Sequence, residues 1–226
     1  KRIGVAENLC DAFPMPLRNR VTPFNEIVSI AARGTLMGNR RRLHDANRTL
    51  TPRHYTTRAW VACVLQFNDR HRPVMQPNRY TELFFLDEPT ALAAGHRPCG
   101  QCRYADYHRF LAAWRAGNDR PQATLAEIDA QLQDDRLDKP VRRQKRFPAS
   151  ASDLPDGTMV SLPLEPGAAF LVWQGRLMEW AASGYHSCRT MPASLQLEVL
   201  TPRSTVKALA AGYRPVPHPT AMSLLG

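Results

Sequence analysis

The chain has 226 residues, of which 43% are hydrophobic, and it carries a net charge of +10 at pH 7. This composition excludes a disordered chain. No apolar run approaches the roughly 20 residues that cross a bilayer, so we expect no membrane partner and a cytoplasmic location. Of the 30 basic residues 26 are arginines, whose guanidinium groups match phosphate, although a GC-rich genome also enriches arginine.

The N-terminal 50 residues are rich in loops and contain a segment, residues 33–45, that combines glycines with polar side chains. Its candidate functional residues are Arg33, Asn39, Arg40, Arg41, Arg42, His44 and Asp45. Glycines at 34 and 38 permit close backbone approach, so we expect a base pocket or a DNA clamp here. The alternative is a basic arm that only screens phosphates.

Two strands and a short helix follow. The continuous apolar run at 58–67 predicts a strand buried on both faces, and residues 81–86 predict a second strand. Residues 87–94 predict a helix, because acids and a proline suit its start and Gly95 suits the left-handed position that ends it.

Two longer helices are predicted next. Tyr107, Phe110, Leu111 and Trp114 recur at helical spacing, which indicates an amphipathic helix over 104–116. A further apolar pattern predicts a helix near 122–134. Prolines and dense charge then indicate a linker or exposed arm at 139–150.

Beyond residue 150 the apolar period changes to two. The segments 170–173 and 176–180 flank Gln174-Gly175 and predict a hairpin, and alternation near 195–199 predicts a strand. We therefore expect an α+β fold, with a small mixed sheet and helices followed by a β-rich C-terminal unit. Its expected parts are residues 1–138, the basic linker 139–150 and residues 151–226.

A sequence repeat links the two halves. Leu92–Pro98 and Leu209–Pro215 match at six of seven positions, Leu-Ala-Ala-Gly-(His/Tyr)-Arg-Pro. The match indicates either a true repeat or convergent helix-stop chemistry. Arg97 and Arg214 within it either anchor phosphates or cap the preceding helices.

The cysteines point to a metal. Five cysteines are an odd number without a secretory context, which argues against a disulfide framework. Cys99 and Cys102 have the C-x-x-C spacing that forms half of a tetrahedral zinc site. For the remaining ligands of a structural zinc we consider His71, His96, His108, His186 and Cys188, with a redox-active pair or ordinary thiols as alternatives.

The segment 86–102 resembles the zinc-binding DNA-repair region of Ada-type methylphosphotriester proteins. The resemblance spans about residues 60–102 and consists of an aromatic strand, an alanine-rich helix and the pattern A-G-[FYH]-R-P-C-x-x-C. The earlier cysteine pair of that family is missing, because His71 and Met75 stand where its cysteines would be. The resemblance implies an association with altered DNA, but methyl transfer does not carry over.

A second, weak resemblance lies in the tail. His218-Pro219-Thr220 is similar to the His-Pro-Ser motif of uracil-DNA-glycosylase-type enzymes, whose histidine stabilises the departing base. The alternative is a proline-rich tail without a catalytic role.

The function that we expect is a DNA enzyme acting on damaged or modified bases, most plausibly a glycosylase that flips the base and hydrolyses its N-glycosidic bond. In this hypothesis Asn39 or Asp45 activates water and His44 or His218 stabilises the leaving group. The expected DNA contacts are Arg33, Arg40, Arg41, Arg42, Arg97, Arg142, Arg143, Lys145, Arg146 and Arg214. The alternatives are a non-enzymatic zinc-dependent DNA-binding or repair module and a metal-dependent nuclease. No nucleotide cofactor is expected, because G-x-G-x-x-G and Walker A patterns are absent.

Overall fold

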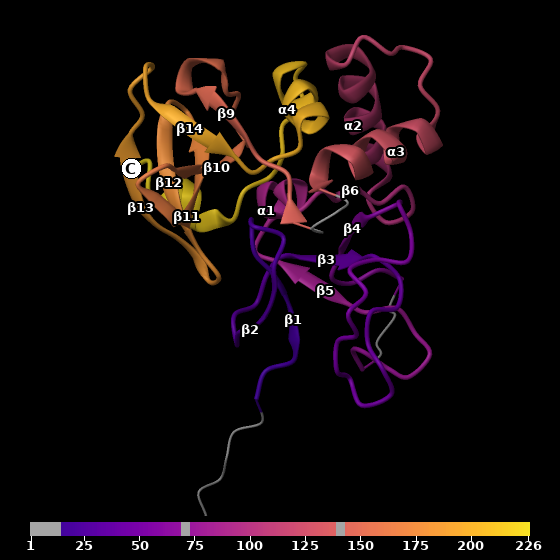
Figure 1. The fold of residues 1–226 in the computed structure, drawn as a ribbon. Coiled ribbons are helices and arrows are strands. Elements are labelled where there is room, and N and C mark those ends of the chain that lie inside the picture. The colour runs from indigo at the N-terminus through magenta and orange to yellow at the C-terminus, as the bar shows by residue number, and fades with distance from the viewer. Residues whose placement is uncertain (1–14, 69–72, 139–142) are drawn as a thin grey trace, which may run out of the picture.

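The computed structural model of the chain describes residues 15–68, 73–138 and 143–226. Within these residues two six-stranded sheets are joined by a layer of helices, which confirms the expected α+β fold (Figure 1). None of the helices in the described part of the chain has the length and apolar character needed to span a membrane.

The N-terminal sheet is mixed and has the strand order β2-β1-β5-β3-β4-β6. Its strands are β1 (Arg18–Val21), β2 (Ile27–Ser29), β3 (Leu36–Asn39), β4 (Val61–Val64), β5 (Leu83–Phe85) and β6 (Arg97–Pro98). The pairs β1–β5 and β4–β6 are parallel, and the others are antiparallel. The expectation that the 58–67 run is buried on both faces is wrong, since within β4 only Ala62 is buried.

The C-terminal sheet is antiparallel throughout, in the order β13-β12-β11-β10-β14-β9. Its strands are β9 (Phe147–Ser150), β10 (Met159–Leu162), β11 (Glu165–Trp173), β12 (Arg176–Ala181), β13 (Gly184–Thr190) and β14 (Gln196–Val199). The predicted hairpin is confirmed, because β11 and β12 meet at Gln174 and Gly175. Both of these residues have positive φ (48° and 68°), as a tight hairpin turn requires.

Of the expected linker 139–150, residues 139–142 lie outside the described residues, and residues 143–150 are built into the fold. β8 (Arg143–Gln144) pairs with β7 (Leu137–Asp138), and β9 pairs with β14 along its whole length. The side-chain Nε2 of Gln144 also lies within 3.1 Å of the carbonyl oxygens of Pro23, Ala93 and Leu200. Charge and proline content alone indicated a linker, whereas backbone pairing joins residues 143–144 to β7 and makes residues 147–150 an edge strand of the C-terminal sheet.

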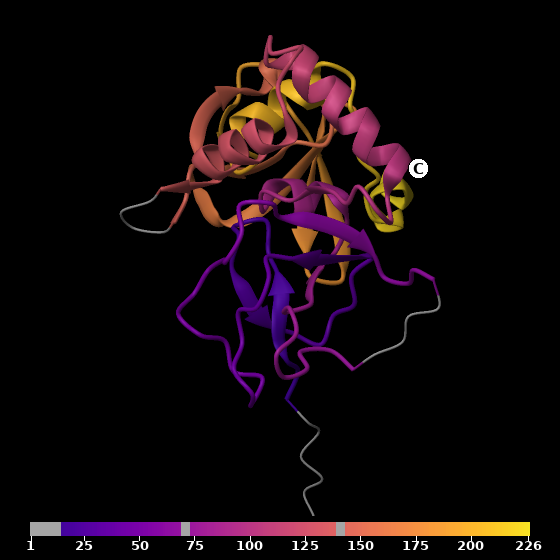
Figure 2. The same cartoon turned by 90° about the vertical axis from the view of Figure 1, so that its right-hand side faces the viewer.

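The helices are α1 (Glu88–Ala93), α2 (Tyr104–Gly117), α3 (Leu125–Arg136), α4 (Arg203–Ala210) and α5 (Pro219–Ser223), with a 3-10 turn at Ala151–Asp153. The predictions for α1, α2 and α3 are confirmed. Helices α2, α3 and α4 pack together through Phe110, Trp114, Ile128 and Leu209, so a helix from the C-terminal half completes a core begun in the N-terminal half (Figure 2).

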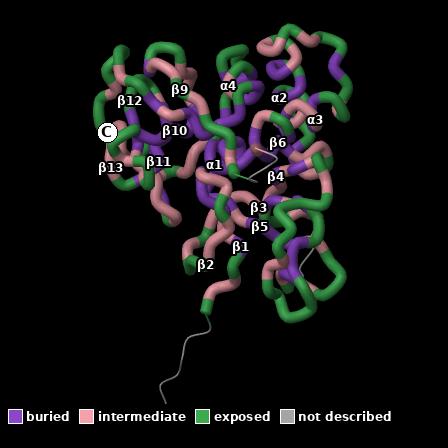
Figure 3. The backbone as a smooth tube through the Cα atoms, in the orientation of Figure 1, coloured by how far each residue is buried: buried purple, intermediate pink, exposed green. Residues whose placement is uncertain are grey.

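Helix α1 occupies the centre of the molecule. All six of its residues are buried (Figure 3). Ala91 packs into the core of the N-terminal sheet, Leu92 into the core of α2–α4, and Ala93 against the C-terminal sheet. Small side chains on this helix therefore let three apolar clusters approach one short element.

The repeated sequence is the same helix stop used twice. After α1, Gly95 has φ +79°, and its N–H donates to the carbonyl of Leu92 at 2.9 Å. After α4, Gly212 has φ +102°, and its N–H donates to the carbonyl of Leu209 at 3.0 Å. The left-handed glycine satisfies the last carbonyl groups of both helices.

Candidate metal centre

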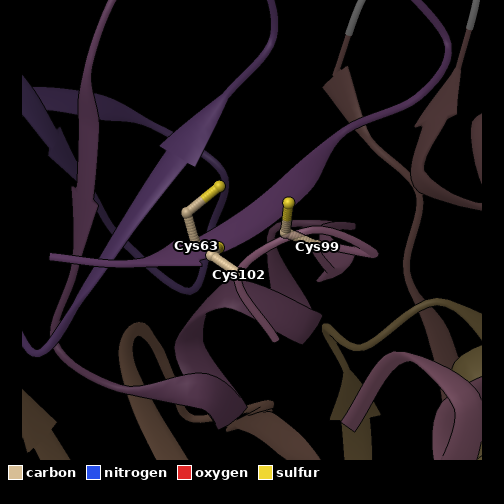
Figure 4. Close-up of side chains that lie close together, drawn as sticks. All are labelled: Cys63, Cys99 and Cys102. Carbon is tan, nitrogen blue, oxygen red and sulfur yellow. The ribbon is translucent and has the colours of Figure 1, made fainter. Parts of the chain in front are cut away.

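Strand pairing brings a third cysteine to the C-x-x-C segment. In the parallel pair of β4 and β6, Ala62 lies opposite Pro98, and the N–H of Cys99 donates to the carbonyl of Ala62 at 2.9 Å. Continuing this register by one residue places Cys63 beside Cys99. The turn that leads into α2 then returns Cys102 to the same place (Figure 4).

The three sulfur atoms form a compact group, all lying within 4.8 Å of one another. Sulfur ligands on a tetrahedral zinc lie about 3.8 Å apart, because each Zn–S bond is about 2.3 Å. The cluster of Cys63, Cys99 and Cys102 therefore fits a metal ion after small side-chain rotations. Within the described ranges, no further cysteine, histidine or carboxylate joins this group.

The electrostatics of the cluster favour one thiolate. Hydrogen bonds from the Cys102 and Cys63 thiols lower the pKa of Cys99, and hydrogen bonds to Cys102 and Cys99, together with burial, raise the pKa of Cys63. A negative charge on the Cys99 sulfur is thus stabilised by hydrogen bonds from the two neighbouring thiols. Thiolates are the form in which cysteine binds metal, so a cation would take over the role of these protons.

The cluster opens onto a cavity of about 380 Å³. The other walls come from the face of the N-terminal sheet and from the loop after β4, with Met37, Phe67, Tyr80, Glu82 and Phe84 among them. All three cysteines are half-buried, so they are reachable from this side. A metal held here would have protein on one side and a mostly apolar space on the other.

The expected ligands His186 and Cys188 are not part of this centre. Both lie on β13 in the C-terminal sheet, where His186 Nε2 lies 3.4 Å from the Glu179 carboxylate. Cys188 is opposite Met178 and packs against the core of that sheet. Their spacing in sequence resembled a second ligand pair, but the sheet places them elsewhere. His71 lies outside the described residues.

The expected catalytic residues are used for local structure. Asn39 caps the N–H of Arg41, and Asp45 caps the turn to Thr49. His44 is buried, with its two ring nitrogens against the Thr81 hydroxyl and the Gln76 carbonyl.

His218 is also engaged, at the start of α5. Its side chain caps α5 by accepting from the N–H of Thr220, and its own N–H donates to Asp87 at 2.9 Å. Each of the four residues offered as alternative catalytic groups therefore has a local structural partner.

Some of the expected DNA contacts are buried inside the protein. Arg97 forms a two-pronged ion pair with Asp129 at 2.7 and 2.8 Å, and Arg40 exposes only 1% of its surface. Neither guanidinium is free to meet a long polyanion at the surface. Arg214 caps the end of α4 through the Leu209 carbonyl, at 3.1 Å.

The remaining expected contacts lie at the surface. Arg33, Arg41, Arg42, Arg143, Lys145 and Arg146 are exposed, whereas Arg142 lies outside the described residues. Several have partners of their own. Arg42 donates to Asn78, Lys145 to the Asp134 carbonyl, and Arg146 to Glu198.

Reasoning from sequence missed Cys63. The residue stands alone in an apolar run, and its only signal is that it lies in the first of the two strands predicted before the C-x-x-C segment. No protein-family model matches the chain, and neither the curated proteins nor the solved structures contain a match to it.

Proposed function

We propose that the chain is a zinc-binding protein that recognises DNA carrying a damaged or modified base and acts as a binding module. The observation that carries the proposal is the convergence of Cys63, Cys99 and Cys102 at the mouth of a cavity. Three soft thiolate donors favour zinc over hard cations such as magnesium.

The metal would have a structural consequence in this proposal. Cys63 belongs to β4, and Cys99 and Cys102 belong to the turn that starts α2, so one ion would fix the sheet to the helical layer. Binding to the folded state alone adds stability in proportion to metal affinity. Zinc held by three thiolates can also take a fourth ligand from the cavity side.

DNA as the partner is supported by charge. The chain carries a net charge of +10, and exposed arginines surround the N-terminal sheet. Phosphate contacts supply most of the affinity of such a surface for nucleic acid. The resemblance of residues 86–102 to a DNA-repair region adds the association with altered bases.

The glycosylase hypothesis has less support. A glycosylase needs a water-activating group and a leaving-group stabiliser at one base. Asp45 and His218, two of the four candidates for these roles, are each engaged in a separate helix or turn cap. The nuclease hypothesis likewise has no gathered carboxylates at the cysteine cluster within the described residues.

The test combines metal analysis with DNA binding. The purified chain is analysed for metal content, and its binding to duplexes with and without a panel of modified bases is measured by fluorescence anisotropy, with and without a chelator. We expect zinc in the purified protein and a preference for a modified duplex that disappears when zinc is removed.

Two outcomes contradict the proposal. If no zinc is retained, or if binding is the same for modified and unmodified duplexes, the chain is not a zinc-dependent lesion-binding module. Breaks that appear only after alkali treatment, in the presence of chelator, would instead support base excision. Treatment of each reaction with alkali is therefore part of the experiment.

A further inference from the structure

A large groove separates the N-terminal sheet from the C-terminal sheet, and its lining is basic. It encloses about 1150 Å³ between the β1–β2 hairpin, the loop at residues 50–54 and the segment 143–146. Pockets that hold drug-sized ligands have about 300–1,000 Å³, so this space suits a longer ligand. We call it the basic groove.

The charge in the basic groove is unbalanced. The five arginines that line it are Arg18, Arg40, Arg53, Arg143 and Arg146, against the two acids Glu26 and Glu198. Glu198 is already paired with Arg146 at 2.9 Å. The side chains of Arg53 and Arg143 are exposed and have no ion pair or hydrogen bond with any described residue. The groove therefore keeps a surplus of positive charge.

Arg40 adds a buried cation at the floor. Its Nε lies 3.1 Å from His96 Nε2, its Nη2 donates to Asn25 at 2.5 Å, and its guanidinium stacks 3.9 Å from the Trp60 ring centroid. No carboxylate within the described residues neutralises it. Burial and the nearby Arg136 lower the pKa of Arg40. Because its guanidinium is enclosed by the protein, we assign it no direct contact with the ligand.

The wall of the basic groove also has an apolar part. Phe24, Ile27, Val28, Leu50 and Pro52 line it beside the arginines. The Arg146 guanidinium lies 5.0 Å from the Phe24 ring centroid, so a planar cation and an aromatic ring are already stacked there. A basic groove with an aromatic side chain on which a base can stack is typical of surfaces that bind single strands.

We propose that the basic groove binds a single-stranded segment of nucleic acid, with backbone phosphates on Arg18, Arg53 and Arg143 and bases against the Phe24 wall. A duplex keeps its base faces stacked inside and offers nothing to this wall, whereas a single strand offers both chemistries. The inference rests on the proposed DNA function, and it adds a second binding surface that shares no lining residue with the cavity at the cysteine cluster.

The experiment compares two double variants that remove the same charge. Arg53→Gln/Arg143→Gln alters the groove, and Arg109→Gln/Arg176→Gln alters exposed arginines on α2 and β12 that do not line it. Binding of a labelled oligothymidine single strand is measured by anisotropy over a range of salt concentrations. Thermal unfolding of each variant verifies that the fold is kept.

For the groove variant we expect the slope of log affinity against log salt to flatten by about 1.4, or about 0.7 for each lost phosphate contact. Affinity at low salt should fall about tenfold or more, while the control variant should keep a slope close to that of the wild type. Unlabelled duplex and thymidine monophosphate should compete poorly with the single strand.

Three results would overturn the inference while leaving DNA binding intact. These are an equal loss in both double variants, a duplex that binds more tightly than the single strand, and a mononucleotide that competes as well as the oligonucleotide. Failure of the wild-type protein to bind any nucleic acid would remove the proposed function as well.

Discussion

The phenol of Tyr185 donates a 2.8 Å hydrogen bond to Oδ2 of Asp87, and this buried contact joins β13 to the start of α1. Asp87 is the N-cap of that helix, and its carboxylate also accepts from the N–H and hydroxyl of Thr90 and from the N–H of His218. One side chain therefore holds the helix, the C-terminal sheet and the tail together.

Asp87→Asn should destabilise the protein by about 2–4 kcal/mol. The carboxylate accepts hydrogen bonds on both oxygens, and an amide would turn a donor toward existing donors and leave buried groups unpaired. Tyr185→Phe should cost less, about 1–3 kcal/mol, because only one hydrogen bond to a charged group is lost. Urea unfolding measures both values. Equal stability of wild type and Asp87→Asn would show that the hydrogen bonds of Asp87 do not hold α1, the C-terminal sheet and the tail together.

The pH dependence of the same pair follows from the direction of the pKa shift. Burial raises the pKa of Asp87 above its ordinary value in spite of the hydrogen bonds from Thr90, His218 and Tyr185. A raised folded-state pKa means that the folded state binds this proton more tightly, so the stabilising contribution is complete below about pH 4 and is lost as pH rises.

The stability difference between wild type and Asp87→Asn should therefore shrink as pH increases from about 4 toward neutrality. Denaturant unfolding at a series of pH values measures this difference, in which titrations common to both proteins cancel. A difference that grows with pH would mean that hydrogen bonding, and not burial, dominates the pKa of Asp87.

Local chemistry made several elements predictable. The hairpin at Gln174 and Gly175 and the start and stop of α1 depend on residues adjacent in sequence, and each has the expected backbone geometry. The longer helix α2 follows from apolar spacing alone. These features need no knowledge of distant parts of the chain.

The site could not be predicted in the same way. Cys63 joins Cys99 only because β4 and β6 pair in parallel in one register, and a lone cysteine gives no sign of that pairing. Likewise, nothing near Arg97 in sequence reveals that Asp129, on another helix, neutralises it. Partners distant in sequence decide which cysteines meet and which arginines remain exposed.

Cys63→Ser should lower zinc affinity by at least about 100-fold. Loss of a ligand should exceed the effect of losing a supporting hydrogen bond, which typically costs 10–100-fold. Competition with a chromophoric chelator measures the affinity, and cobalt substitution reports thiolate ligands through their charge-transfer absorption. Cys188→Ser is the matched control, because that cysteine lies in the other sheet, and it should leave both signals unchanged. Equal losses in the two variants would refute the three-cysteine centre.

The two helix stops offer a comparison within one protein. Gly212→Ala should cost about 1–2 kcal/mol, because an L-residue is strained at φ +102° but its new methyl group would meet nothing within 4 Å. Gly95→Ala has similar backbone strain, and its methyl group would also lie 2.4 Å from Cδ of Arg136. Overpacking adds about 1–3 kcal/mol, so Gly95→Ala should be clearly the less stable variant.

The reason for the larger cost lies in what Arg136 does. Its guanidinium stacks 3.8 Å from the Trp60 ring centroid and donates to the carbonyls of Gly95 and Arg58, so it cannot move aside without breaking these contacts. Thermal and urea unfolding of both alanine variants measure the difference. If the two variants are equally stable, Arg136 can move at little cost, and the buried stack on Trp60 is not a rigid part of the fold.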